Sequence, residues 1–477
     1  MITFILSIIV LIAAYFIYGR VVEKIFGIDS HAITPAIRKQ DGVDYVPMKP
    51  WRIFMIQFLN IAGLGPIFGA IMGAKFGTAS FLWIVFGCIF GGAVHDYLAG
   101  MISLRRDGAS LPEIHGAYLG KAVKQFMRVF MVILMVLVGV VFVIGPAGLL
   151  EKLTPDALNA SFWIVIIIIY YIIATLLPID KIIGKIYPIF GFTLLFMAFG
   201  IMISLFIHYP SLPEIWEGLH NTHPQATTTP IFPMMFVSIA CGAISGFHAT
   251  QSPLMARCMT NERQGRPIFF GAMIAEGIVA LIWAAAASYF FYNNGMGETN
   301  AAVIVDNITK DWLGTFGAVL AVLGVIAAPI TTGDTAFRSA RLIVADFLHY
   351  DQKPIRNRLI IAIPLFLAGL GILFFSINDK NGFDIIWRYF AWANQVLAAV
   401  TLWAITIYLL NEKKPYIITL LPALFMTMVC VTYIFIAQEG FALNQLWSYI
   451  IGGFTSSLCL LTFIFYLKKH KNKAKTQ

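Results

Sequence analysis

Two stretches of glycine, proline and polar residues interrupt long hydrophobic runs in this chain. They are Asn-Ile-Ala-Gly-Leu-Gly-Pro at 60–66 and Cys-Gly-Ala-Ile-Ser-Gly-Phe-His-Ala-Thr-Gln-Ser-Pro at 241–253. A segment that crosses a membrane is normally an unbroken helix, because no water is available there for free backbone N–H and C=O groups. Interrupted backbone persists only where it is buried in protein or lines a cavity. Two such segments, in two halves of a chain, are typical of the binding site of a secondary transporter.

The composition indicates a membrane environment. Of the 477 residues, 59% are hydrophobic and only 12% are charged, whereas soluble domains carry about 25% charged residues. We therefore predict an all-α, polytopic membrane protein surrounded by lipid. The formal net charge is +9, but the basic residues are spread over loops in a pattern that sets orientation. No nucleic-acid partner is expected for that reason.

Apolar runs of about 20 residues, the length that crosses a bilayer, predict about thirteen transmembrane helices. Their ranges are 2–19, 53–73, 79–103, 125–148, 161–178, 183–207, 231–256, 267–292, 313–331, 358–376, 384–409, 415–437 and 443–467. With the N-terminus outside, most Lys and Arg residues fall in the cytoplasmic loops and the C-terminal tail. The positive-inside rule therefore predicts an external N-terminus and a cytoplasmic C-terminus.

Each interrupted segment begins a set of five predicted helices. Because five is odd, the two sets enter the membrane from opposite faces, which is the five-plus-five inverted repeat that allows alternating access around one central site. One helix precedes this core and two follow it. The predicted divisions are an N-terminal helix with a cytoplasmic loop at 1–52, a first repeat at 53–207, a second repeat at 231–409 and two C-terminal helices with a basic tail at 415–477.

The first interruption is predicted to bind substrate through Asn60, Gly63, Gly65 and Pro66. The N-terminal end of a half-helix carries partial positive charge and free N–H groups, so it suits an anion such as a carboxylate. Gly63 and Gly65 let a ligand approach the backbone, and Pro66 can begin the second half-helix. Asn60 offers a donor and an acceptor. The alternative is a glycine face that packs helices together.

The second interruption carries Ser245, His248 and Ser252 at helical spacing, with Gln251 beside them. A neutral imidazole accepts or donates a proton near physiological pH. We predict that Ser245, His248 and Gln251 bind substrate, with either a substrate or a proton role for His248. The alternative for His248 is a core histidine with satisfied hydrogen bonds.

Three further titratable residues lie within predicted spans. Glu276 is in the middle of its span, where an ionised carboxylate is costly unless it is paired. We predict either a proton relay or a buried structural tie. His95 and Asp96 lie toward the inner end of theirs. They form an inner gate, or Asp96 tethers the loop that contains Arg105.

A third polar cluster occupies 328–338. Thr331 and Thr332 can coordinate a hard cation together with backbone carbonyls. Asp334 and Arg338 are four residues apart with the acid first, so they are predicted to pair on one helix face, either as a gate or as a structural element.

Two neighbouring amides, Asn394 and Gln395, lie in a later apolar span. Their polarity indicates that they line the same cavity as the interruptions and contribute to substrate binding, or that they join helices by hydrogen bonds.

These motifs resemble the carbon starvation (CstA) family of bacterial inner-membrane transporters. The matching segments are 60–66, 91–96 with 105–108, 241–253, 275–277, 331–346 and 391–395. The resemblance implies a LeuT/APC-like core, the inner membrane, and uptake of peptides or of pyruvate under carbon starvation. It also implies a sodium site at Ala328, Thr331 and Thr332, although other members are described as proton-driven. The coupling ion is therefore H⁺ or Na⁺, and no cofactor is expected.

We therefore predict an ion-coupled importer of short peptides or of a small carboxylate such as pyruvate. Both substrates carry a carboxylate that a half-helix N-terminus would hold. An intramembrane enzyme is a weaker alternative, because the sequence lacks HExxH and GxSxG signatures, and no catalytic residue is assigned. A passive channel is the other alternative, and the two opposed interruptions argue against it.

Overall fold

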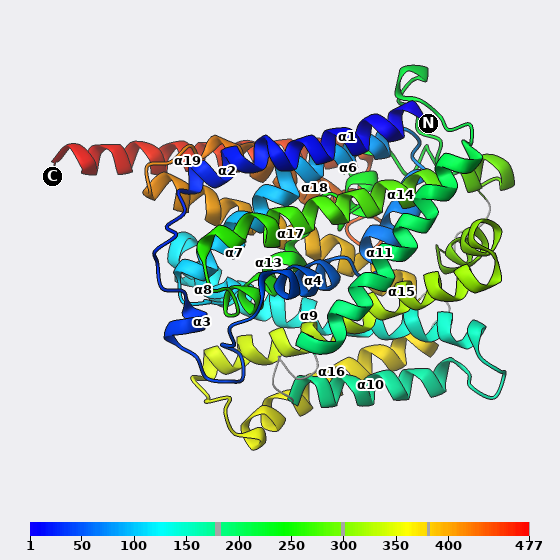
Figure 1. Ribbon diagram of the computed structural model, residues 1–477. Helices are drawn as coiled ribbons and strands as arrows, with labels where there is room; N and C mark the ends of the chain where they lie inside the picture. The colour runs from blue at the N-terminus through cyan, green and yellow to red at the C-terminus, as the bar shows by residue number, and fades with distance from the viewer. Residues whose placement is uncertain (177–182, 297–300, 379–381, 477) are drawn as a thin grey trace.

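The computed structural model describes residues 1–176, 183–296, 301–378 and 382–476, and within those ranges its regular structure is entirely helical. The last two residues of the predicted span 161–178 lie outside the described residues. Figure 1 shows the longer helices running side by side in one bundle. The prediction of an all-α polytopic protein is confirmed at this level.

The helices of the first part of the chain include both long spans and short pieces. They are α1 (Ile2–Phe16), α2 (Tyr18–Phe26), α3 (Pro35–Arg38), α4 (Pro50–Ile61), η1 (Gly65–Gly69), α5 (Ala70–Ala74), α6 (Ala79–Phe86), η2 (Gly87–Gly92), α7 (Ala93–Arg105), α8 (Leu111–Leu119), α9 (Lys121–Leu153), α10 (Ala160–Leu176) and α11 (Ile183–His208). Proline occupies the first turn of α3, α4, η1 and α8, where its missing N–H costs nothing.

The second part repeats this mixture of short and long helices. They are η3 (Ile215–Glu217), η4 (Ile231–Met235), α12 (Phe236–Ser238), α13 (Gly246–Ala256), η5 (Glu262–Gln264), η6 (Arg266–Phe270), α14 (Gly271–Asn294), α15 (Ala301–Leu348), α16 (Ile355–Asn378), α17 (Gly382–Asn411), α18 (Ile417–Ile436) and α19 (Gln445–Thr476). Within α15, Gly314 has a φ of 64° and divides the helix into two segments.

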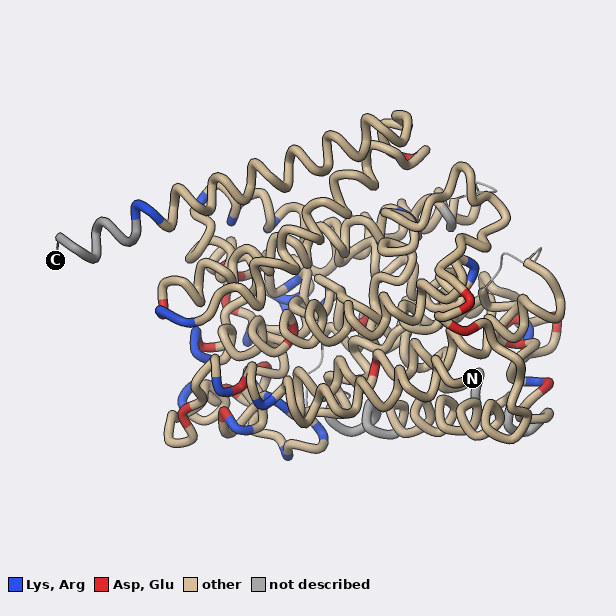
Figure 2. The backbone as a smooth tube through the Cα atoms, turned by 90° about the horizontal axis from the view of Figure 1, so that it is seen from above, with Lys and Arg blue, Asp and Glu red and all other residues tan. Residues whose placement is uncertain are grey.

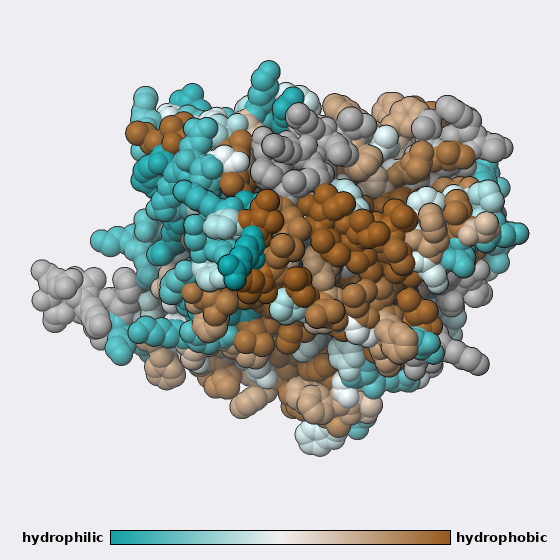
Figure 3. Space-filling model, turned by 90° about the horizontal axis from the view of Figure 1, so that it is seen from below, coloured by the Kyte–Doolittle hydropathy of each residue, from teal (hydrophilic) through white to brown (hydrophobic). Residues whose placement is uncertain are grey.

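The described residues contain nine helical stretches that are long and apolar enough to cross a membrane. A tenth arises if Pro50–Ile61 and Gly65–Ala74, which meet at 51°, form one span, and Ala160–Leu176 is a shorter apolar helix. Exposed side chains on the outside of the bundle are often large and apolar, such as Phe196, Phe374 and Phe454. Figure 3 shows apolar residues across the middle of one face, with hydrophilic residues at both ends.

Helices α9 and α15 pack extensively against each other. They come close because Gly139 of α9 lies against the Phe337 ring, where a Cβ atom would be only 2.3 Å from the nearest ring atom. Helix α4 packs on α13, α14 and α15, so the two interrupted segments both lie inside the bundle. In Figure 1, α1, α2 and α19 run along one face, and α10 and α16 run along the opposite one.

Candidate functional site

The first interruption is a bend of 51° between α4 and the η1–α5 segment. Asn60 is in the last turn of α4, residues 62–64 leave the helix, and Pro66 is in the first turn of η1. The predicted start of a second half-helix at Pro66 is therefore confirmed. The whole turn is buried, as backbone freed from a helical ladder must be within a membrane.

The second interruption is shorter than the sequence indicated. Backbone is irregular only at 239–245, and Gly246–Ala256 forms the regular helix α13. The prediction that Ser245 shares a helix face with His248 and Ser252 is wrong, because Ser245 precedes the helix in an extended conformation with φ −140° and ψ 122°. The later residues of the predicted stretch remain helical although Pro253 lies among them.

The two interruptions are in direct contact. A Cβ atom on Gly65 would lie 2.3 Å from both Cβ and Sγ of Cys241, so only glycine fits there without movement of the neighbour. A Cβ atom on Gly63 would lie 3.1 Å from the Thr332 hydroxyl and 3.2 Å from the Phe142 ring. These close approaches bring residues from the two halves of the sequence to one point in the fold.

Asn394 and Gln395 of α17 bond the backbone that the second interruption frees. The Phe247 backbone N–H donates to Asn394 Oδ1 at 2.6 Å, and Asn394 Nδ2 donates to Ser245 Oγ at 2.9 Å. Gln395 Nε2 donates to the Ile244 carbonyl at 3.0 Å. A neighbouring helix thus supplies both the acceptor and the donor that the unwound turn lacks.

At the first interruption, Thr332 of α15 meets the free carbonyls. Its hydroxyl lies 3.1 Å from the Asn60 carbonyl, 3.4 Å from the Leu59 carbonyl and 2.9 Å from the Ala328 carbonyl. The Thr331 hydroxyl also bonds the Ala328 carbonyl, at 2.7 Å. Carbonyl and hydroxyl oxygens converging in this way are the ligand types that a hard cation takes.

Four titratable side chains form a buried row across α7, α13 and α14. His95 Nδ1 lies 2.8 Å from Asp96 Oδ1, and Asp96 Oδ2 lies 2.9 Å from His248 Nδ1. His248 Nε2 lies 3.3 Å from Glu276 Oε2, within ion-pair distance. All four are 0% exposed. Asp96 therefore does not tether the Arg105 loop, and that alternative is wrong; Arg105 bonds Glu262 instead.

Hydrogen-bond capacity constrains where the protons of this row can be. An ionised Asp96 has no proton to donate, so it accepts from both imidazoles through their Nδ1 atoms. A neutral His248 then has a bare lone pair at Nε2. Neither carboxyl oxygen of Glu276 accepts a hydrogen bond from a described residue. In the described part of the chain, no three His, Cys, Asp or Glu side chains are arranged to hold a metal ion.

Asp334 and Arg338 lie further along α15. Asp334 Oδ2 accepts a hydrogen bond from the Tyr170 hydroxyl at 2.8 Å. Arg338 donates to the Ala174 carbonyl at 2.6 Å and lies 3.6 Å from Asp44 Oδ1. Arg338 therefore connects α15 to the segment before α4.

Sequence reasoning missed several polar residues of this region. Gln57, one turn before Asn60, is 0% exposed, and neither polar atom of its side-chain amide has a hydrogen-bond partner among the described residues. Thr335 lies 3.5 Å from Asn60 Oδ1, and Asp44 faces Arg338. Gln57 could have been found from its place on the same half-helix as Asn60, but only the fold could reveal Asp44 and Thr335. Of the predicted residues, Gln251 bonds its neighbour Thr250 at 2.9 Å.

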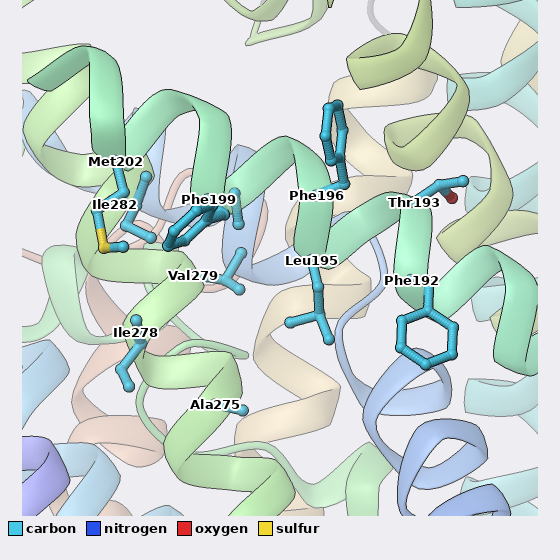
Figure 4. Close-up of a pocket in the computed structure, with 11 residues that line it drawn as sticks. Phe192, Thr193, Leu195, Phe196, Phe199, Met202, Ala275, Ile278, Val279 and Ile282 are labelled. Atoms are coloured by element: carbon cyan, nitrogen blue, oxygen red, sulfur yellow. The ribbon is translucent and has the colours of Figure 1, made fainter.

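A cavity of about 830 Å³ opens on the outside of the bundle between α11 and α14. Figure 4 shows Phe192, Leu195 and Phe196 of α11 on one side and Ile278 and Val279 of α14 on the other. None of the predicted site residues is among the described residues that line it. The polar groups converge instead in the closely packed interior around the two interruptions.

Comparison with known proteins gives a consistent result. The model of the family described as carbon starvation protein CstA matches residues 1–156, 154–305 and 291–433. An uncharacterized membrane protein of Haemophilus influenzae is 44% identical over 341 residues, which are 61% of this chain and 92% of that protein. A peptide transporter CstA of Bacillus subtilis is 27% identical, over 90% of this chain and 88% of the relative.

Two further proteins extend the comparison. The pyruvate/proton symporter BtsT of Escherichia coli is 25% identical, over 90% of this chain and 80% of the relative. Among solved structures, the Eremococcus coleocola manganese transporter, in complex with an aromatic bis-isothiourea substituted compound, has a TM-score of 0.53 at 11% identity. The match covers 90% of this chain and 98% of that one. This likeness shows the fold of a membrane transporter.

Proposed function

This chain belongs to the carbon starvation protein CstA family, and we propose that it is an ion-coupled importer of small carboxylates such as pyruvate or of short peptides. The observation that carries the proposal is the contact between the two interruptions at Gly65 and Cys241. It places two half-helix ends and a group of buried polar side chains at one point inside an apolar bundle. A secondary transporter holds its substrate at such a point.

The pattern of helix packing supports an inverted repeat. In such a repeat, α4 would correspond to α13, α9 to α15, α10 to α16 and α11 to α17. Two helices that pack together in one half should then have counterparts that pack together in the other half. Accordingly, α4 packs on α11 as α13 packs on α17, and α9 packs on α10 as α15 packs on α16. The contact of α15 with α11 likewise corresponds to that of α9 with α17. On this basis we propose a LeuT/APC-like core of five plus five helices among about thirteen spans.

The distribution of charge supports the proposed orientation. Figure 2 shows that most Lys and Arg residues gather at the end of the bundle from which the C-terminus projects, whereas the N-terminus lies toward the other end. By the positive-inside rule, we place the C-terminus in the cytoplasm and the N-terminus outside a bacterial inner membrane.

The buried row of His95, Asp96, His248 and Glu276 supports proton coupling. An ionised Glu276 would be a second buried carboxylate near Asp96 with no hydrogen-bond donor among the described residues, which is costly. A proton shared between Glu276 and His248 removes that charge. Loading and release of this one proton can then accompany the change between outward-facing and inward-facing states.

The oxygens around Thr332 support sodium as the other candidate coupling ion. The carbonyls of Leu59, Asn60 and Ala328 all lie within 3.4 Å of its hydroxyl. A sodium ion there would join the first interruption to α15. The name of the Escherichia coli relative, a pyruvate/proton symporter, favours the proton.

The substrate proposal follows from the half-helix ends. The N-terminal end of η1 suits a carboxylate, which pyruvate and a dipeptide share, whereas the Phe247 N–H at the start of α13 already bonds Asn394. A dipeptide also carries an ammonium group, and Glu276 or Asp96 would have to face it. The names of the relatives, peptide transporters and a pyruvate symporter, cover both classes.

The test is uptake of radiolabelled pyruvate and of a dipeptide into proteoliposomes, with a proton gradient and a sodium gradient imposed separately. We expect accumulation of at least one solute above its external concentration. We also expect Glu276→Gln to lower proton-driven accumulation at least about tenfold while solute exchange without a gradient persists. The matched control is Glu412→Gln, which alters an exposed glutamate on a loop.

Each result decides a separate part of the proposal. If neither solute accumulates under either gradient, the proposed transport function is wrong. If Glu276→Gln accumulates pyruvate and dipeptide as the wild type does, the glutamate carries neither the coupling proton nor the ammonium contact.

A further inference from the structure

Four buried arginines gather near the end of α15 that carries Arg338. Arg338, Arg341, Arg358 and Arg257 are 1%, 0%, 4% and 7% exposed. We name these four residues the arginine cluster. Arg257 directly follows α13, and the others belong to α15 and α16. In Figure 1 these parts lie at the end of the bundle where the C-terminus projects, with α3 and the loop to α4.

The partners of the arginine cluster are mostly uncharged. Arg257 donates to the Gly108 carbonyl at 3.0 Å, and Arg358 donates to the Gln352 carbonyl at 2.6 Å and the Leu176 carbonyl at 2.5 Å. A carbonyl dipole satisfies an N–H group but does not neutralise the charge. Buried charge of one sign is costly unless an opposite charge lies close by.

Arg341 has unused hydrogen-bond donors. Its Nη1 donates to the side chain of Gln352, but Nε and Nη2 have no hydrogen-bond partner among the described residues. The guanidinium presents its donors in a fixed fork that matches a carboxylate or a phosphate. A fully buried guanidinium with two donor atoms that no described residue bonds therefore indicates a place for an anion.

The Asp44 carboxylate already reaches this cluster. Its Oδ1 lies 3.6 Å from Arg338 Nη1, and Asp44 also acts electrostatically on Arg341 and Arg257. Asp346 acts on Arg257 as well. Among the described residues, these two carboxylates act on three of the four guanidinium groups, and an additional anion would be attracted.

Asp44 belongs to a small loop, residues 41–48, which we name the plug segment. Asp41 Oδ1 accepts hydrogen bonds from the backbone N–H groups of Val43, Asp44 and Tyr45 at 2.8, 3.0 and 2.9 Å. The segment is therefore folded on itself. The Met48 backbone N–H donates to the Cys258 carbonyl at 3.1 Å, and the Tyr45 hydroxyl donates to the Asp107 carbonyl at 2.8 Å. The segment also contacts the arginine cluster, because Arg257 lies over the Tyr45 ring and Asp44 faces Arg338. A unit held in this way can move as a whole.

A row of polar residues leads from the first interruption to this place. Thr332, Thr335, Arg338 and Arg341 follow one another along α15 about one turn apart. Thr332 and Thr335 contact Asn60, and Arg338 faces Asp44. The plug segment therefore covers the end of a polar path that begins at the proposed substrate site.

We propose that the arginine cluster is a second anion site, which Asp44 occupies while the plug segment is closed and which the carboxylate of the transported solute occupies when the plug segment opens. The inference rests on the proposed transport of a carboxylate. Replacement of one carboxylate by another keeps the net buried charge the same in both states. The solute thereby lowers the cost of withdrawing Asp44, so the exit opens when cargo is present.

The test is hydrogen–deuterium exchange of residues 41–48 in the full chain, held in nanodiscs of neutral lipid. We expect millimolar acetate to speed exchange of the plug segment at least about threefold, and chloride at equal ionic strength to have a smaller effect. Asp44→Asn should raise exchange without acetate. Arg341→Gln should abolish the acetate response, and Arg341→Lys should retain part of it. The control is Arg106→Gln, an exposed arginine that bonds Tyr118, whose response should match the wild type.

Several results would overturn the proposal. One is exchange in the wild type that does not respond to acetate. Another is an equal response in Arg341→Gln. If nanodiscs with anionic phosphatidylglycerol reproduce the effect and acetate adds nothing, the cluster binds lipid phosphate instead. Should Arg341→Gln misfold, the exchange rates of Asp44→Asn and Arg341→Lys still test the proposal. Hydrogen–deuterium exchange can be measured without transport. An acetate response in a protein that accumulates no solute would therefore reject the proposed transport function but still support the anion site.

Discussion

The two interruptions differ in what bonds their free backbone. At the second one, side chains of α17 do so: Asn394 accepts from the Phe247 N–H and Gln395 donates to the Ile244 carbonyl. At the first one, the described residues offer the Leu59 and Asn60 carbonyls only the single hydroxyl of Thr332, at 3.4 Å and 3.1 Å. Asn60 Nδ2 has no hydrogen-bond partner among the described residues.

This difference indicates a division of roles. The second interruption is held by fixed protein groups, as a structural element should be. The first one retains donors and acceptors that a ligand can use. We therefore expect substitutions at the second interruption to act mainly on stability and those at the first to act mainly on transport, whereas the contact between the two should affect both.

The largest effect is expected at that contact. Gly65→Ala places a Cβ atom 2.3 Å from Cys241, so one segment must move. Overpacking of this kind costs about 1–3 kcal/mol of stability. A shift of the two interruptions relative to each other should lower uptake about tenfold or more. Proteoliposome uptake and thermal unfolding in detergent measure the two effects.

A compensating variant and a matched control sharpen this prediction. Cys241→Gly removes the opposing Cβ and Sγ atoms, so the double variant should regain most of the uptake that Gly65→Ala loses. Gly148→Ala, on α9, has no atom within 4 Å of its ideal Cβ, and it should be neutral or stabilise the protein slightly. If Gly65→Ala transports at the wild-type rate, the two interruptions do not need to be in contact.

The next effect is on stability, at the second interruption. Asn394→Leu removes the acceptor of the Phe247 N–H and the donor to Ser245, and it leaves buried backbone without a partner. The expected loss is about 1–3 kcal/mol, visible as a lower Tm in the purified protein. Asn411→Leu is the control, because Asn411 is exposed on the same helix, and it should change stability by less than about 0.5 kcal/mol. Equal Tm values for the two variants would show that α17 does not hold the second interruption.

The sequence predicted the existence of both interruptions because glycine, proline and polar residues cannot be placed against lipid without a reason. It did not predict the end of the second one, since Ser245 and the residues after it are compatible with either state. It also could not reveal that Asp96 bridges His95 and His248, because this contact joins residues 152 positions apart. Pairing across helices is fixed by packing, which a periodic apolar pattern does not encode. The same limit applies to Asp44, a loop residue whose partner Arg338 lies in α15.

The smallest effect on stability is expected from Thr332→Val at the first interruption. Valine keeps the shape of threonine and removes only the hydroxyl that contacts the Ala328, Asn60 and Leu59 carbonyls. The unfolding free energy should fall by about 1 kcal/mol, less than for Asn394→Leu. Uptake should still fall severalfold, because the carbonyls of the first interruption lose their hydrogen bonds to α15. Thr309→Val is the matched control, since Thr309 is also buried but bonds only carbonyls of its own helix. If sodium-driven uptake disappears in Thr332→Val while proton-driven uptake persists, these oxygens bind the ion. If instead Thr332→Val loses stability as much as Asn394→Leu and transports normally, the first interruption is structural, and the proposed difference between the two does not exist.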